Sequence, residues 1–156
     1  MAHIKGYQLI RNDRKDRRAG GVAIYLQSHL KYKILAQSTN SARDFFAEYI
    51  ICEVVINSHN KLFVAVVYRP PNTPFYKGTS FLQTISNLSQ DYSNKLILGD
   101  FNSNMLTVNP QSSIIKIFIQ ENNLYLIRHG ITHIKNESSS HVDLCIVDAN
   151  DLVISK

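Results

Sequence analysis

Apolar residues in the first half of the chain occur in alternating or short unbroken runs, the pattern typical of β-strands. The runs at 48–56 and 61–68 are separated by the polar residues 57–60, which predicts a hairpin with a short loop. Pro70 and Pro71 end the second run, because proline cannot donate a hydrogen bond to a sheet. Shorter strands are expected over residues 7–10 and 22–26.

The second half of the chain changes to a helical period. Apolar spacing predicts one helix around residues 81–88 and another after Pro110. The positions concerned are Phe81, Leu82, Ile85 and Leu88 in the first, and Ile114, Ile115, Phe118 and Ile119 in the second. Further extended segments are expected at 95–98, 124–127 and 142–147. Hairpins mixed with helices predict a layered α/β domain with a largely antiparallel sheet.

The chain has 156 residues, enough for one domain with a substantial core but not for two. Hydrophobic residues make up 44% and charged residues 19%, values typical of a globular protein. No apolar segment is long enough to span a bilayer, so a membrane partner is not expected. Cys52 and Cys145 lie in apolar strand-like runs without the spacing of a metal site, which predicts buried free thiols in a reducing compartment.

The formal net charge is +5, which suits a polyanionic partner such as nucleic acid. Five of the basic residues lie in the segment 11–18, interrupted by Asp13 and Asp16. We interpret this segment first as a solvated loop between two strands. The alternative is a loop that contacts backbone phosphates near a cleavage site.

Candidate chemistry lies where the apolar run 96–98 ends in Gly99-Asp100-Phe101-Asn102. Asp100 and Asn102, two positions apart, project from the same side of an extended backbone and can reach one phosphate, water or metal ion. The alternative is that they cap a helix or form an Asx-turn. The blocks that flank this motif favour a functional site.

Four short sequence blocks follow one another along the chain: residues 20–25 (Gly-Gly-Val-Ala-Ile-Tyr), 67–71 (Val-Tyr-Arg-Pro-Pro), 98–102 (Leu-Gly-Asp-Phe-Asn) and 140–144 (Ser-His-Val-Asp-Leu). This order resembles the endonuclease/exonuclease/phosphatase superfamily, and within it the apurinic-endonuclease-like domain of non-LTR retrotransposons of the jockey type. The resemblance implies a four-layered α/β sandwich like that of deoxyribonuclease I. It also implies phosphodiester cleavage with Mg²⁺, or Mn²⁺ in its place, which nicks target DNA to prime reverse transcription.

The resemblance implies roles for individual residues. Asp100 would orient or deprotonate the attacking water, and it is the candidate metal ligand. Asn102 would hold a phosphate oxygen, and the Tyr68 hydroxyl would contact the scissile phosphate. An in-line attack needs these groups, because it requires an activated water, a metal ion and donors to the phosphate oxygens. From the residues alone, Tyr68 can equally be an ordinary strand tyrosine beside a proline turn.

Asp143 matches the acid that orients the catalytic histidine of the family. Its position in an apolar strand predicts a buried carboxylate with a partner. Thr132 and Ser140 match more loosely positions on the DNA-facing side. We expect His141, which alternation places on the same face as Asp143, to be a surface or lining residue, and His133 to be solvated.

The chain departs from the family pattern at both ends. No match to the metal-binding glutamate block occurs before Gly6, and no Ser-Asp-His block occurs before Lys156. We therefore expect residues 1–156 to form part of one domain that by itself binds metal weakly and cuts DNA poorly. A phosphatase on the same fold, or a degenerate fragment that binds nucleic acid without cutting it, are the alternatives. A nuclear location would follow only from the DNA substrate, and the pattern gives no oligomeric state.

Overall fold

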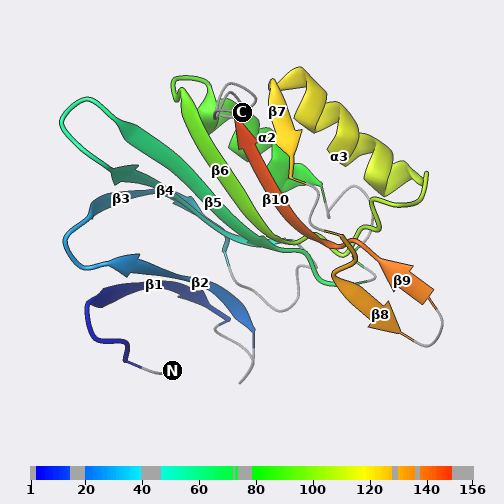
Figure 1. Cartoon of the computed structure of the whole chain (residues 1–156), viewed down its shortest axis with the longest axis horizontal. Coiled ribbons are helices and arrows are strands. Elements are labelled where there is room, and N and C mark those ends of the chain that lie inside the picture. The colour runs from blue at the N-terminus through cyan, green and yellow to red at the C-terminus, as the bar shows by residue number, and fades with distance from the viewer. Residues whose placement is uncertain are drawn as a thin grey trace.

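The computed structural model describes residues 3–14, 20–39, 47–71, 73, 79–127, 130–135 and 138–148. The strands are β1 (Tyr7–Asp13), β2 (Gly21–Gln27), β3 (Lys31–Gln37), β4 (Glu48–Val55), β5 (Lys61–Tyr68), β6 (Asn94–Asp100), β7 (Leu124–Leu126), β8 (His133–Lys135), β9 (Ser138–Ser140) and β10 (Asp143–Asp148). The helices are α2 (Ser80–Ser89) and α3 (Pro110–Glu121). Figure 1 shows how these elements are arranged around one large sheet.

The large sheet has six strands in the order β3-β4-β5-β6-β10-β7. Strands β5 and β6 are parallel, and the other neighbouring pairs are antiparallel. The predicted hairpin of residues 48–56 and 61–68 is present as β4 and β5, so the expected α/β fold with a mainly antiparallel sheet is confirmed. Strand β3 was not predicted, because its exposed lysines and a register shift between Ile34 and Ala36 break the apolar alternation.

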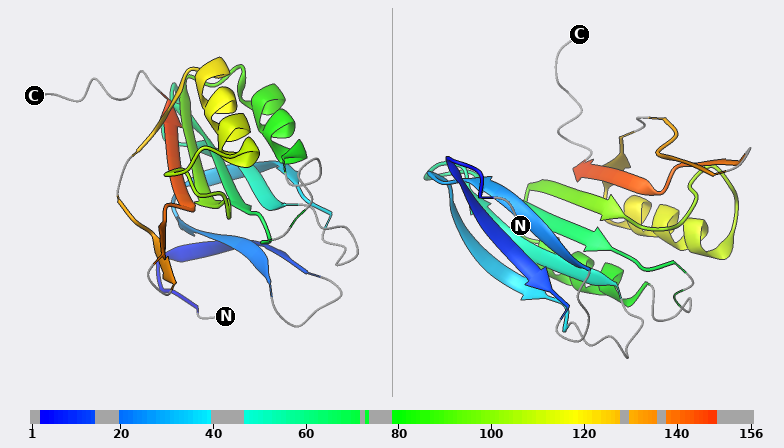
Figure 2. Two further views of the ribbon diagram at one scale, coloured as in Figure 1. Left: turned by 90° about the vertical axis from the view of Figure 1, so that its right-hand side faces the viewer. Right: turned by 90° about the horizontal axis from the view of Figure 1, so that it is seen from below.

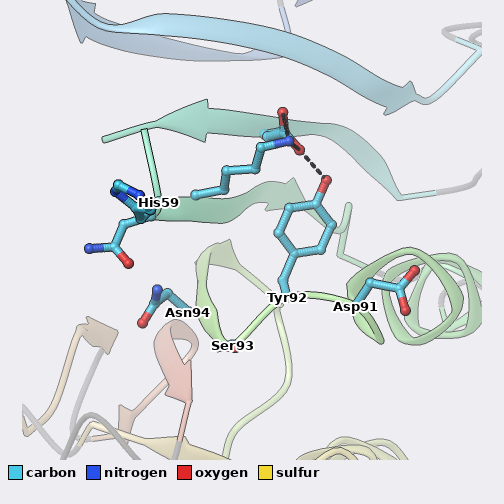
Figure 3. Close-up of a pocket in the computed structure, with 8 residues that line it drawn as sticks. His59, Asp91, Tyr92, Ser93 and Asn94 are labelled. Atoms are coloured by element: carbon cyan, nitrogen blue, oxygen red, sulfur yellow. Dashed lines mark hydrogen bonds and ion pairs between the residues drawn. The ribbon is translucent and has the colours of Figure 1, made fainter. Parts of the chain in front are cut away.

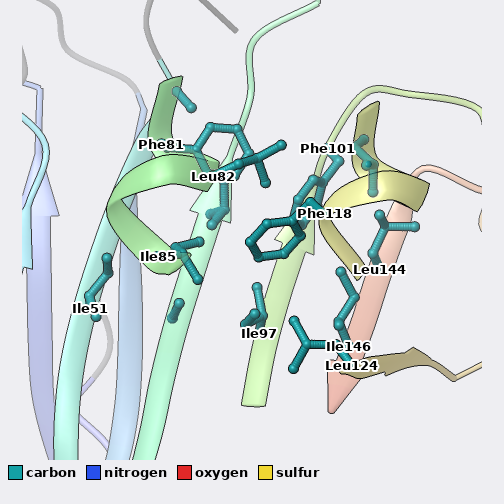
Figure 4. Packing of buried hydrophobic residues seen from close by; sticks show 14 of the residues in the cluster. Ile51, Phe81, Leu82, Ile85, Ile97, Phe101, Phe118, Leu124, Leu144 and Ile146 are labelled. Atoms are coloured by element: carbon teal, nitrogen blue, oxygen red, sulfur yellow. The ribbon is translucent and has the colours of Figure 1, made fainter. Parts of the chain in front are cut away.

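Helices α2 and α3 cover one face of the sheet, and the main core lies between these helices and the sheet (Figure 4). Its largest fully buried side chains include Phe63, Phe101, Ile85 and Ile97. Both predicted helices are therefore confirmed, and they bury the apolar positions that defined them. None of the described helices is long and apolar enough to cross a membrane.

The pair β1–β2 packs on the opposite face of the sheet, over β4 and β5 (Figure 2). Ile10 and Val22 contact Ile50 there. Helices, large sheet and the β1–β2 pair are three of the expected layers, and the described residues contain no second helical layer on the β1–β2 side. The segment 11–18 is not wholly a loop, because β1 continues to Asp13; residues 15–19 lie outside the described residues.

Both cysteines are free, as expected. Cys52 is buried and Cys145 is partly buried. Burial raises the pKa of the Cys52 thiol to about 11, and it also raises the pKa of Cys145. Neither thiol is therefore suited to nucleophilic chemistry at neutral pH.

Candidate active site

Three of the residues singled out in the sequence form one row across neighbouring strands. Tyr68 at the end of β5 is in register with Asp100 at the end of β6, and Asp100 is in register with Asp143 at the start of β10. Residues paired in this way present their side chains on the same face of a sheet. The structure therefore brings Tyr68, Asp100 and Asp143 together at one end of the sheet, on the side that carries β1–β2.

The backbone turns sharply after Asp100. The Asn102 backbone N–H donates to Asp100 Oδ1 (2.8 Å), and Asn102 Nδ2 donates to Asp100 Oδ2 (3.0 Å) and to the carbonyl oxygen of Arg69 (2.8 Å). Asn102 has a positive φ of 44°, in the left-handed region that asparagine tolerates better than most residues. The Asx-turn considered from the sequence is thus formed, and it fixes the two polar groups against each other.

Asp100 lies in an environment that disfavours its charge. Burial raises the pKa of Asp100, and the nearby negative charge of Asp143 raises it further. Hydrogen bonds from Asn102 and the proximity of His133 act in the opposite direction, but the net direction is upward. Asp100 is therefore a carboxyl whose pKa lies above its ordinary value of 3.8, which moves it toward the range of a general base.

Tyr68 lies beside two charged residues: Arg14, from the basic segment 11–18, and Glu48, which the sequence did not single out. Glu48 is in register with Tyr68 on β4, and its carboxylate forms an ion pair with Arg14. The Arg14 guanidinium lies over the Tyr68 ring, 5.8 Å from its centroid. Alternation along β4 is the only sequence signal that places Glu48 on the same face as Tyr68. The ion pair of Glu48 with Arg14 could not be predicted from the sequence.

Thr132 organises the start of β10. Its Oγ1 accepts hydrogen bonds from the backbone N–H groups of Val142 (3.0 Å) and Asp143 (3.1 Å). The backbone N–H of Thr132 donates to the carbonyl of Ser140, and Ser140 Oγ donates to the carbonyl of His133 (3.4 Å). Thr132 therefore lies beside the row, whereas Ser140 is displaced toward the β8–β9 pair.

Two burial expectations were wrong. Asp143 is exposed, since the β1–β2 pair covers β4 and β5 and leaves this end of β10 open among the described residues. His141 is buried, with 4% of its surface exposed. It precedes β10 and is held by the loop after β6, where Asn104 Oδ1 accepts from its backbone N–H and Met105 N donates to its carbonyl. His133 is exposed, as predicted, although it lies in β8.

The described residues contain no group of three His, Cys, Asp or Glu side chains that could hold a metal ion. Asp100 and Asp143 nevertheless form a pair of neighbouring carboxylates at an open end of the sheet. Mg²⁺ is commonly bound by one or two carboxylates, with water and substrate phosphates completing its ligands. The oxygen donors present therefore fit a hard divalent cation.

A polar pocket of about 350 Å³ lies at the opposite end of the sheet (Figure 3). Lys61 and Asn94, which line it, begin β5 and β6, whereas Tyr68 and Asp100 end these strands. Hydrogen bonds from Tyr92 and Lys61 lower the pKa of Glu53, and burial raises the pKa of Tyr92 to about 12. These contacts connect β4, β5 and the segment after α2, and the pocket is separate from the candidate site.

Comparison with known proteins identifies the class. The fold is that of the endonuclease/exonuclease/phosphatase proteins, because solved structures of family proteins with this description match over 91% and 92% of this chain. The endonuclease domain of TRAS1, a telomere-specific non-LTR retrotransposon, matches with a TM-score of 0.69 and 15% identity over 96% of this chain and 70% of its own. The human Nocturnin catalytic domain (TM-score 0.60, 17% identity) and ANGEL2, a 2',3'-cyclic phosphatase (0.66, 16%), match over 92% and 93% of this chain.

The sequence matches the family described as endonuclease-reverse transcriptase over residues 62–155, and the chain belongs to this family. The resemblance noted from the four sequence blocks is thereby confirmed. No curated protein matches the sequence. The chain spans 61% and 64% of the Nocturnin and ANGEL2 chains, less than two thirds of either.

Proposed function

We propose that this chain carries the catalytic strands of a metal-dependent DNA endonuclease that hydrolyses a phosphodiester bond. The observation that carries the proposal is the row Tyr68–Asp100–Asp143, with Asn102 fixed against Asp100. Membership of the endonuclease-reverse transcriptase family supports DNA as the substrate. In this role the protein would nick target DNA to prime reverse transcription, and it would act in the nucleus.

Asp100 is proposed to orient the attacking water and to accept its proton. Its raised pKa supports this role, because a base whose pKa is closer to neutrality accepts a proton more readily in the transition state. In the structure both oxygens of Asp100 accept hydrogen bonds from Asn102. A phosphate oxygen that accepts the hydrogen bond of Asn102 Nδ2 would replace Asp100 Oδ2 as its acceptor. Asp100 Oδ2 would then be available to bind the water.

Asp100 and Asp143 are the residues proposed to hold Mg²⁺ or Mn²⁺. The bound ion would stabilise the negative charge that develops on the phosphate oxygens. Asp143 is also open to a second role, the orientation of a histidine, because it is exposed. Both roles require an ionised carboxylate at this position, so removal of its charge should impair the reaction in either case.

The remaining residues are proposed to bind the substrate. Tyr68, held by Arg14 on one side of its ring, would donate its hydroxyl to the scissile phosphate. Thr132 and Ser140 would lie along the DNA. Thr132 Oγ1 already accepts from two backbone N–H groups, so Thr132 would bind a phosphate by donating its hydroxyl proton. These contacts position the DNA backbone and do not read its sequence.

The proposal is tested with the protein translated from the full reading frame that encodes these residues. Nicking of supercoiled plasmid is measured with Mg²⁺, with Mn²⁺ and with chelator, for the wild type, Asp100→Asn and the matched control Asp91→Asn. Asp91 is exposed at the far end of the sheet. We expect metal-dependent nicking that Asp100→Asn lowers about a hundred- to ten-thousandfold and Asp91→Asn leaves unchanged.

Other results would contradict the proposal in distinguishable ways. Metal-dependent release of phosphate from inositol phosphates, without nicking, would indicate a phosphatase on this fold. Salt-sensitive DNA binding without any cleavage, unaffected by Asp100→Asn, would indicate a nucleic-acid-binding module.

A further inference from the structure

Arg69 follows Tyr68 directly, yet it is almost completely buried, with 2% of its surface exposed. Its Nη1 donates to the carbonyl oxygens of Phe101 (3.1 Å) and Asn102 (3.1 Å), and its Nη2 donates to the carbonyl oxygen of Thr73 (3.2 Å). These acceptors are all backbone carbonyls. The guanidinium therefore connects the segment after β5 with the turn after β6.

The main chain of Arg69 engages the same turn. Its N–H donates to the carbonyl of Asp100 (2.8 Å), and its carbonyl accepts from Asn102 Nδ2 (2.8 Å). Arg69 thus contacts each of the residues 100 to 102 through its backbone or its side chain. Since Asn102 has a left-handed backbone conformation, its geometry depends on such external contacts.

The burial of this arginine is unfavourable in itself. A buried charge is costly unless it is paired, and none of the hydrogen bonds described for the guanidinium involves a carboxylate. In addition, Nε has no hydrogen-bond partner among the described residues. Burial lowers the pKa of Arg69, while the charge of Asp100 raises it. An apolar side chain would avoid this desolvation, but it would leave the carbonyls of Phe101, Asn102 and Thr73 without these donors.

We propose that Arg69 is the positioning residue of the active site, whose guanidinium fork holds the turn 101–102 so that Asn102 and Asp100 face each other. The inference rests on the proposed nuclease function and adds a residue to it. Lysine cannot replace arginine here, because a single ammonium group lacks the planar fork that reaches the Phe101, Asn102 and Thr73 carbonyls together. Thr73 is itself fixed by a hydrogen bond from its Oγ1 to the Pro70 carbonyl (2.6 Å).

The test compares the wild type with Arg69→Lys and with the control Lys116→Arg, an exposed position on α3. Backbone hydrogen exchange is measured separately for peptides that cover residues 101–105 and β6. Nicking kinetics are measured in parallel. We expect Arg69→Lys to speed exchange in 101–105 alone and to lower kcat about a hundredfold, the effect of a misplacement of about 1 Å, with KM for DNA unchanged. Lys116→Arg should alter neither quantity.

The inference is overturned if Arg69→Lys folds with wild-type exchange in 101–105 and wild-type kcat. It is also overturned if exchange speeds up equally in β6 while kcat per folded molecule stays constant, because the role is then only structural. If Arg69→Lys does not fold, the same measurements are made on Thr73→Ala. Faster exchange in 101–105 with a lower kcat, both smaller in size, supports the inference, and unchanged exchange and kcat reject it. Absence of nicking in the wild type would reject the proposed function, whereas the exchange data would still decide the role of Arg69.

Discussion

Gly99 lies so close to the backbone of Val67 that a Cβ atom on it would be 1.8 Å from the Val67 carbonyl oxygen. Its φ of +151° is also one that L-residues rarely adopt. The two residues are register partners in the parallel pair β5–β6, one position before Tyr68 and Asp100. The glycine of the Gly-Asp-Phe-Asn block is therefore required for the close approach that brings those two side chains together.

Gly99→Ala is expected to destabilise the protein by about 3 kcal/mol or more, because backbone strain and a clash with backbone atoms add together. The matched control is Gly6→Ala, where φ is +84° but nothing lies within 4 Å of the added Cβ. That change should cost about 1–2 kcal/mol from strain alone. Urea unfolding of both variants measures the difference, and equal losses would contradict the role given to the Val67 contact.

The raised pKa of Asp100 predicts a specific pH dependence. A carboxyl whose pKa is higher in the folded than in the unfolded state favours folding when protonated, and this contribution is lost as pH rises from about 3.8 through the folded value. The melting temperature of Asp100→Asn, relative to the wild type, should therefore increase between pH 3 and neutrality and then level off. Melting curves across this range check the sign, and a constant difference would contradict it.

Asn102→Gly provides a second test of the same carboxyl. Glycine tolerates the positive φ, so the change removes the amide without adding strain. The hydrogen bond from the Asn102 side chain lowers the pKa of Asp100, and its loss should raise that pKa further. An NMR titration of the Asp100 carboxyl carbon measures this shift. A lower midpoint than in the wild type would show that the amide does not stabilise the charged form.

Much of the fold could be predicted from local patterns, since β4, β5 and both helices carry clear periodicity. The predictions that Asp143 is buried and His141 exposed were wrong for the same reason. Local alternation does not show which part of a sheet face is covered by another layer. The backbone of His141 is hydrogen-bonded to the loop that contains Asn104 and Met105, far away in the sequence. Strand β3 escaped prediction because an edge strand can expose its side chains on both faces.

The candidate site was only partly accessible from the sequence. The contact between Asp100 and Asn102 was anticipated only as the alternative Asx-turn, because β6 ends at Asp100 and Asn102 does not continue the extended backbone that the two-residue spacing assumed. The register of Tyr68 with Asp100 depends on the pairing of β5 with β6, which the sequence pattern does not encode. Arg69 lies in one of the four sequence blocks, but no role was predicted for it, because arginine at the end of a strand is ordinarily exposed. Its importance became visible only with the three carbonyl groups that it contacts.

The start of α3 offers a test of local stability. Asn109 Oδ1 accepts from the Ser112 N–H (2.9 Å), and Ser112 Oγ accepts from the Asn109 N–H (3.1 Å), which together form a capping box. Asn109→Ala should cost about 1 kcal/mol, whereas Asn109→Asp should retain the cap and most of the stability. Thermal unfolding distinguishes the two variants; an equal loss in both would mean that the cap contributes little.

Lys95 and Asp148 form an ion pair (3.1 Å) with only 13% and 3% of their side chains exposed. Lys95→Met should destabilise the protein by about 3–5 kcal/mol, because it leaves the Asp148 carboxylate buried without its counter-charge. The double variant Lys95→Met, Asp148→Leu removes both charges and should recover most of that loss. The pair between Lys61 and Glu53 is the control, since 57% of the Lys61 side chain is exposed and Glu53 keeps a second donor in Tyr92, so Lys61→Met should change stability less. Urea unfolding of the wild type, Lys95→Met, Asp148→Leu and the double variant gives the coupling energy between the two side chains. If the double variant is no more stable than Lys95→Met, the loss comes from packing of the lysine stem and not from the uncompensated charge.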